Sequence, residues 1–128
     1  MTYKTAQVYS GSEWIDLAVA ITDATKREVV NISGTSHPLT LANAGRALVF
    51  TNSSTVSVTV PVESSVNFDI GQTIILLQKG TGQVQVEGAV GVTLLSSGSK
   101  TKIDAQYGEA RLIKIASNEW LLSGDLSV

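Results

Sequence analysis

Strict alternation of apolar and polar residues is the feature that most limits how this chain can fold. Residues 55–61 read TVSVTVP, which places Val56, Val58 and Val60 on one face of an extended strand and hydroxyl side chains on the other. Residues 83–87 (QVQVE) and 111–115 (RLIKI) repeat the pattern. A period of two is typical of a half-buried β-strand. The chain is therefore predicted to be all-β.

One segment departs from this alternation. Residues 73–77 read TIILL and are apolar almost without interruption. A strand of this kind suits a position that is covered on both faces, either between two sheets or at a contact with another subunit.

Short polar turns separate the strands. Residues 52–54 (NSS) and 79–82 (KGTG) each lie between two apolar segments, and we expect both to close hairpins, with the glycines taking positive φ. Strands that recur every 8–12 residues favour an antiparallel β-sandwich or barrel, which we expect to be jelly-roll-like. No helix longer than two turns is expected.

The chain divides into two predicted regions. Residues 1–26 form an N-terminal arm with a hairpin in which 7–9 and 13–15 flank Ser-Gly-Ser, and residues 27–128 form the β-domain. The arm is too short to bury its own large side chains, so we expect it to pack on the domain or on a neighbouring subunit. The residues predicted to serve in an interface or in binding are Tyr9, Trp14, Ile15 and Tyr107.

Composition excludes several classes of function. Only 16% of residues are charged, the net charge is −2, and no cluster of Lys and Arg provides a footprint for nucleic acid. The absence of Cys excludes disulfides and thiolate metal sites. No segment resembles a signal peptide or a membrane-spanning helix. We expect a protein that is assembled in a cytoplasm and does not insert into membranes.

The sequence also argues against catalysis. His37 is the only histidine, it precedes Pro38, and no Gly-x-Ser-x-Gly nucleophile elbow is present. The eleven carboxylates are scattered, and no calcium or phosphate loop occurs. We therefore expect no enzyme activity, no cofactor and no metal. A ring of His37 side chains around a three-fold axis is the alternative that would bind a metal, and Trp120 is expected to pack in the core.

Several motifs occur together in the C-terminal two thirds. Residues 104–126 (DAQYGEARLIKIASNEWLLSGDL) place Gln-Tyr before a strand, followed by Lys, Asn-x-Trp and Gly-Asp-Leu. VFTN at 49–52, GQTI at 71–74 and GTGQV at 80–84 precede them. Residues 45–126 thus resemble β-modules of tailed-bacteriophage fibre and other virion proteins, and VYSGSEW at 8–14 resembles their Tyr-x-Gly-x-x-Trp hairpins.

The resemblance implies a trimeric virion component and supplies no catalytic residues. Because the arm before the domain is short, we expect a compact accessory protein that decorates or cements the capsid and stabilises the particle. The alternative is a tail-fibre module or a tip that binds a receptor or a carbohydrate. Expected partners are other copies of the chain and the major capsid or tail proteins, with a host surface glycan as the partner of a tip.

Overall fold

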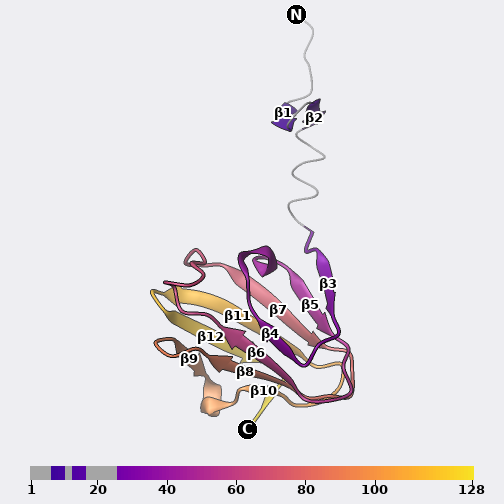
Figure 1. Cartoon of the computed structure of the whole chain (residues 1–128), viewed down its shortest axis with the longest axis vertical. Coiled ribbons are helices and arrows are strands. Elements are labelled where there is room, and N and C mark those ends of the chain that lie inside the picture. The colour runs from indigo at the N-terminus through magenta and orange to yellow at the C-terminus, as the bar shows by residue number, and fades with distance from the viewer. Residues whose placement is uncertain (1–6, 11–12, 17–25) are drawn as a thin grey trace, which may run out of the picture.

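The computed structural model describes residues 7–10, 13–16 and 26–128, and its strands form three sheets (Figure 1). The smallest is the hairpin of β1 (Gln7–Ser10) and β2 (Glu13–Asp16). The five-stranded sheet, in spatial order, contains β13 (Leu126–Ser127), β10 (Lys102–Ile103), β8 (Val84–Gly88), β6 (Val56–Val60) and β4 (Ser36–Pro38). The six-stranded sheet contains β3 (Val29–Ile32), β5 (Ala47–Phe50), β7 (Thr73–Gln78), β11 (Glu109–Ala116), β12 (Glu119–Gly124) and β9 (Thr93–Ser96).

The prediction of an all-β chain is confirmed. Helical structure in the described residues consists of two single turns of 3-10 helix, η1 (Leu41–Asn43) and η2 (Ser97–Ser99). Within the same residues, no helix is long and apolar enough to cross a membrane.

The prediction of antiparallel, jelly-roll-like sheets is wrong for much of the domain. From β3 to β8 the chain changes sheet after every strand. Two neighbouring strands of one sheet are therefore separated in sequence by a strand of the other sheet, and they run parallel. The pairs among β3, β5 and β7 and among β4, β6 and β8 are all parallel. The β11–β12 hairpin then inserts between β7 and β9, which makes the six-stranded sheet mixed. The five-stranded sheet is mixed because β10 runs antiparallel to both β8 and β13.

The two predicted hairpin turns are therefore arches between the sheets. The arch at 79–83 stacks directly on the arch at 51–55: the backbone N–H groups of Lys79 and Gly80 both donate to Phe50 O at 2.9 Å, and that of Gly82 donates to Asn52 O at 3.0 Å. A Cβ atom on either glycine would overlap the backbone of the arch beneath it, and neither glycine has positive φ. Close approach, and not turn geometry, requires glycine here.

The N-terminal hairpin is confirmed as an antiparallel strand pair. Tyr9 pairs in register with Trp14, and Val8 with Ile15. The side chains of these strands, and residues 1–6, 11–12 and 17–25, lie outside the described residues. The division into an arm (1–26) and a domain (27–128) stays a prediction.

The core lies between the two large sheets and receives side chains from both. The alternating valines of β6 and β8 point inward, as predicted, and meet Leu and Ile side chains of the opposite sheet. Trp120 is buried, with its ring edge-on to that of Phe68 at a centroid distance of 5.3 Å, so its predicted place in the core is confirmed. No strand pair joins the two large sheets within residues 26–128, so this region does not close into a barrel.

Candidate functional site

The outer face of the six-stranded sheet is rich in large apolar side chains, with polar ones such as Asn31, Thr73 and Ser123 among them, and is called the apolar face below. The backbone register aligns Val29, Ala47 and Ile75 in one row across β3, β5 and β7, and Val49 with Leu77 in the next. A third row crosses β11, β12 and β9. The face leaves large apolar side chains partly open to solvent, with exposed fractions of 58% for Val29, 41% for Ile115, 40% for Leu95 and 36% for Leu121.

The outer face of the five-stranded sheet is polar instead. Its central strands carry Ser57 and Thr59 on β6 and Gln85 and Glu87 on β8, with Lys102 beside them on β10. The Thr59 hydroxyl donates to Glu87 Oε1 at 3.4 Å. This face suits contact with water, whereas the other face suits contact with a partner.

The origin of this difference is visible in the sequence of β7. Ile74 and Leu76 are fully buried between the sheets, whereas Ile75 and Leu77 point to the outer face and are half-buried. The apolar run was predicted to mark a strand covered on both faces. The inner face is covered by the opposite sheet, and the outer face has no second layer within residues 26–128.

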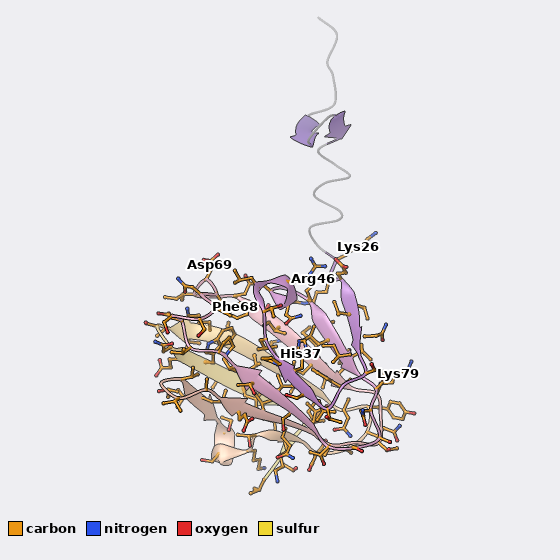
Figure 2. The ribbon with its side chains drawn as sticks, in the orientation of Figure 1. Lys26, His37, Arg46, Phe68, Asp69 and Lys79 are labelled. Atoms are coloured by element: carbon orange, nitrogen blue, oxygen red, sulfur yellow. The ribbon has the colours of Figure 1, made fainter. Side chains whose placement is uncertain are left out.

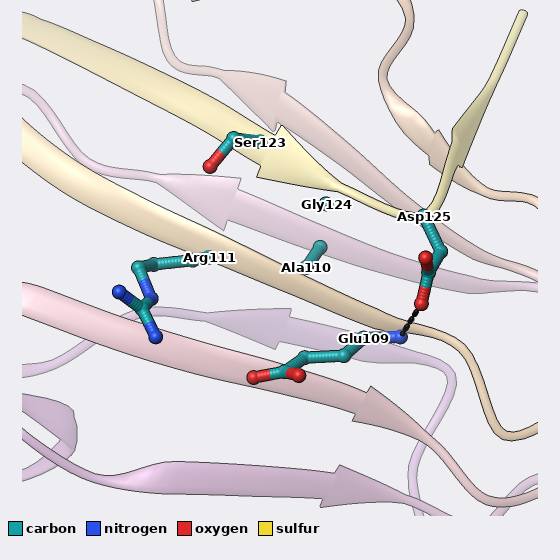
Figure 3. Close-up of a pocket in the computed structure, with 6 residues that line it drawn as sticks. All are labelled: Glu109, Ala110, Arg111, Ser123, Gly124 and Asp125. Atoms are coloured by element: carbon teal, nitrogen blue, oxygen red, sulfur yellow. Dashed lines mark hydrogen bonds between the residues drawn. The ribbon is translucent and has the colours of Figure 1, made fainter.

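Two opposite charges lie within the apolar face. Glu109 and Arg111 occupy alternate positions of β11, in register with Leu77 and Ile75, and both side chains are exposed. They border a hollow of about 220 Å³ where β12 ends at Gly124 (Figure 3). Gly124 has φ of +127°, and a Cβ atom there would overlap Glu109 O, so this corner carries no side chain.

Tyr107 lies at one end of this face. It is 78% exposed, it has φ of +68°, and its backbone N–H donates to Gln78 O at 2.6 Å. It borders an apolar hollow of about 360 Å³ with Val49, Leu77 and Lys79. In Figure 2, Lys79 and Asp69 mark opposite ends of the sheets, and this hollow lies at the Lys79 end. Of the four predicted binding residues, Tyr107 is thus placed on the surface, and the other three have side chains outside the described residues.

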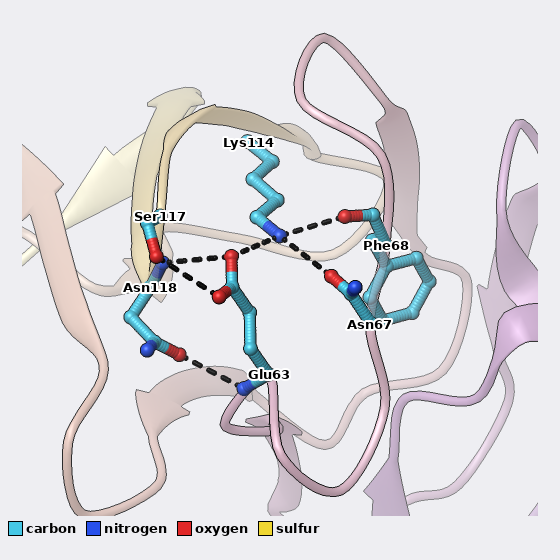
Figure 4. Close-up of polar contacts among 6 residues, drawn as sticks. All are labelled: Glu63, Asn67, Phe68, Lys114, Ser117 and Asn118. Carbon is cyan, nitrogen blue, oxygen red and sulfur yellow. Dashed lines mark hydrogen bonds and ion pairs between the residues drawn. The ribbon is translucent and has the colours of Figure 1, made fainter.

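Sequence reasoning missed a polar network inside the domain, centred on Lys114 (Figure 4). Lys114 is 2% exposed, and its Nζ lies 2.6 Å from Phe68 O, 3.3 Å from Asn67 Oδ1 and 2.6 Å from Glu63 Oε1. Three acceptors thus satisfy the three N–H donors of the ammonium. The signal was present in the alternation, because Lys114 shares the inward face of β11 with the buried Leu112.

Glu63 completes the network from the loop between β6 and β7. Its carboxylate accepts hydrogen bonds from Ser117 Oγ at 2.9 Å and from the backbone N–H of Asn118 at 3.3 Å. The Asn118 Oδ1 in turn accepts from the Glu63 backbone N–H at 2.8 Å. The Lys114 ammonium, and after it the Ser117 hydroxyl, lower the pKa of Glu63 below its ordinary value. These contacts hold a loop against the β11–β12 turn and present no nucleophile.

His37 is placed in a structural role. It lies on β4, half-buried, with Nε2 3.0 Å from Asn43 Oδ1 and its ring edge-on to Phe50 (Figure 2). Among the described residues, no group of three or more His, Cys, Asp or Glu side chains is arranged to hold a metal ion.

The chain matches no protein-family model, and no curated protein is similar to it in sequence.

Proposed function

We propose that this protein is a structural component of a bacteriophage virion that decorates or cements the particle surface. The observation that carries the proposal is the contrast between the two outer faces. The apolar face of the six-stranded sheet is held against a neighbouring protein, and the polar face of the five-stranded sheet is turned to solvent. The resemblance of residues 45–126 to virion β-modules supports the virion setting.

The two sheets act in this proposal as one sandwich-type module. Its parallel, stacked strands give a stiff body, and the network around Lys114 fixes the long loop at 61–72 to that body. A rigid module keeps the apolar face flat enough to fit a partner. No bond is made or broken, so the role is mechanical.

Burial of the apolar face supplies the driving force. Removing at most about 400 Å² of apolar surface from water contributes no more than roughly 10 kcal/mol before association costs. The loss of translational and rotational freedom on association offsets a large part of this favourable free energy. The N-terminal arm, residues 1–26, adds contact area in the proposed assembly, which we propose is a trimer bound to capsid or tail proteins.

Density-gradient centrifugation of a phage lysate tests this function. The protein should band with intact particles and should stay with them after washing at moderate salt. Recovery of all of the protein in the soluble fraction, with none on particles, would contradict the proposal. Leu121→Lys should abolish banding with particles, and Thr59→Lys, on the polar face, should not.

A receptor-binding tip is the second candidate, and the exposure of Tyr107 favours it. An exposed ring beside an apolar hollow is an arrangement that can stack on a sugar. A glycan array tests this directly. Binding that disappears in Tyr107→Ala would support a tip, and no binding to any glycan would leave decoration as the favoured role.

A further inference from the structure

Glu109 and Arg111 on the apolar face differ from the paired charges at the edge of the six-stranded sheet, and Glu119 on β12 is likewise without an ion pair within residues 26–128. Arg46 forms an ion pair with Glu28, and Arg27 donates to Gly45 O at 3.2 Å and to Thr73 Oγ1 at 3.1 Å. By contrast, the side chains of Glu109 and Arg111 form no ion pair or hydrogen bond with another residue of 26–128. Two exposed and opposite charges thus lie unpaired on the surface that is best suited to burial.

A partner with a purely apolar surface would fit this face poorly. Covering it would remove Arg111 and Glu109 from water without giving either charge a counter-ion, and an unpaired buried charge is costly. The occupant must therefore bring a negative group to Arg111 and a positive group to Glu109.

A second copy of the chain brings both groups. Glu109 and Arg111 lie on the same face of one strand, about 7 Å apart along it. When two copies meet face to face around a two-fold axis, a residue that contacts another is contacted by it in return. Arg111 of each copy then lies opposite Glu109 of the other, and Ile75, Leu77 and Ile113 are covered around them.

We infer that the outer face of the six-stranded sheet is the contact between copies of this protein, with Arg111 of one copy paired with Glu109 of its neighbour. The inference rests on the proposed function, since it names the partner that covers the apolar face. Such a face-to-face contact has two-fold symmetry and is therefore separate from the three-fold contact of the proposed trimer.

The size of the apolar face determines the expected strength of self-association. Six strands about 4.8 Å apart, with a rise of about 3.3 Å per residue, give a face of roughly 24 by 17 Å. This is below the roughly 800 Å² per partner of a standard stable interface. We therefore expect self-association that depends on concentration in the micromolar range.

Charge exchange tests the pairing in the full chain. Arg111→Glu and Glu109→Arg are compared with the double exchange, by sedimentation equilibrium at several protein concentrations. Each single substitution should weaken self-association about tenfold, because it places like charges opposite each other. The double exchange should restore association to within about threefold of the original protein.

Matched controls lie on the polar face. Lys102→Glu and Glu87→Arg change the net charge by the same amounts and should leave self-association unchanged. Circular dichroism and thermal unfolding show whether each variant is folded.

Three results would overturn the inference. The first is an original protein that stays monomeric at every concentration. The second is single variants that behave like their controls. The third is that the single substitutions lower thermal stability but leave the mass measured by sedimentation unchanged, which would show that the chain's own arm covers the face. Banding with particles is measured separately and can persist without contact between copies, so failure here and failure of the proposed function are distinguishable.

Discussion

The Nζ of Lys114 lies 2.6 Å from Oε1 of Glu63, and this ion pair joins the centre of β11 to the loop between β6 and β7. The same Nζ reaches Phe68 O at 2.6 Å, and Phe68 packs edge-on against Trp120. One buried ammonium therefore holds a long loop in place and closes one end of the core. The loop has little regular structure of its own, so its position depends on this contact.

Lys114→Met is expected to destabilise the domain by about 1–3 kcal/mol, because it leaves the buried Phe68 carbonyl and its neighbours without a donor. Met keeps the length and the packing of the aliphatic chain. Urea denaturation measures the effect. Lys102→Met, on the polar outer face, is the matched control and should change stability by less than about 0.5 kcal/mol. Equal effects of the two substitutions would show that the network does not stabilise the fold.

Acid should weaken the same network. The pKa of Glu63 is lowered first by the Lys114 ammonium and then by Ser117, so its value in the folded protein is below its value of about 4.5 in the unfolded chain. The contribution of Glu63 is therefore fully present above that ordinary value and is lost as the pH falls through the folded value.

Glu63→Gln should remove this part of the pH dependence, so that the stability of the variant falls less steeply below pH 4.5 than that of the original protein. Denaturation midpoints across the acid range provide the measurement, with Glu87→Gln on the outer face as the control. A curve for Glu63→Gln that runs parallel to that of the original protein would contradict this assignment.

Much of the domain could be predicted from local patterns. The period of two in β6 and β8 correctly placed Val56, Val58, Val60, Val84 and Val86 in the core. The apolar run in β7 predicted a strand covered on both faces. Its inner face is buried against the opposite sheet, and cover on its outer face stays a prediction. Such predictions succeed because side-chain direction in a strand depends on local geometry alone.

The motif behind the resemblance consists largely of residues that fix the fold. Asn118 adopts φ of +51° in the β11–β12 turn, and Gly124 accommodates the backbone of Glu109 and Ala110. Asp125 Oδ2 accepts from the Glu109 backbone N–H at 3.1 Å. These residues are explained by their turns and contacts without any catalytic role.

The partners of the strands could not be predicted in the same way. An arch between sheets and a hairpin within a sheet use the same polar and glycine-rich residues. Which of the two forms depends on the strand with which the next segment pairs, and that strand is distant in the sequence. Gly80 and Gly82 fit a hairpin turn, yet they are required by the arch at 51–55 beneath them. The same limit hid the ion pair of Glu63 with Lys114, which are 51 positions apart.

Gly82→Ala tests the stacked arches. The new Cβ would overlap the Ser54 carbonyl, and we expect a loss of about 1–3 kcal/mol in stability from the strain. Gly34→Ala is the control, because the nearest atom to its Cβ would be Ser36 O at 3.9 Å. That substitution should change stability by less than about 0.5 kcal/mol. Similar results for the two glycines would argue against direct stacking of the arches.

The central claim is that the apolar face of the six-stranded sheet is covered in the assembled particle and that the polar face is not. Because the chain contains no Cys, a single thiol can report on each face. Leu121→Cys places it on the apolar face and Thr59→Cys on the polar face. The measurement is the rate at which a thiol-reactive label modifies each variant in particles and in dilute, free protein. We predict strong protection in particles at position 121 and none at position 59. Equal labelling of position 121 in particles and in free protein would contradict the account.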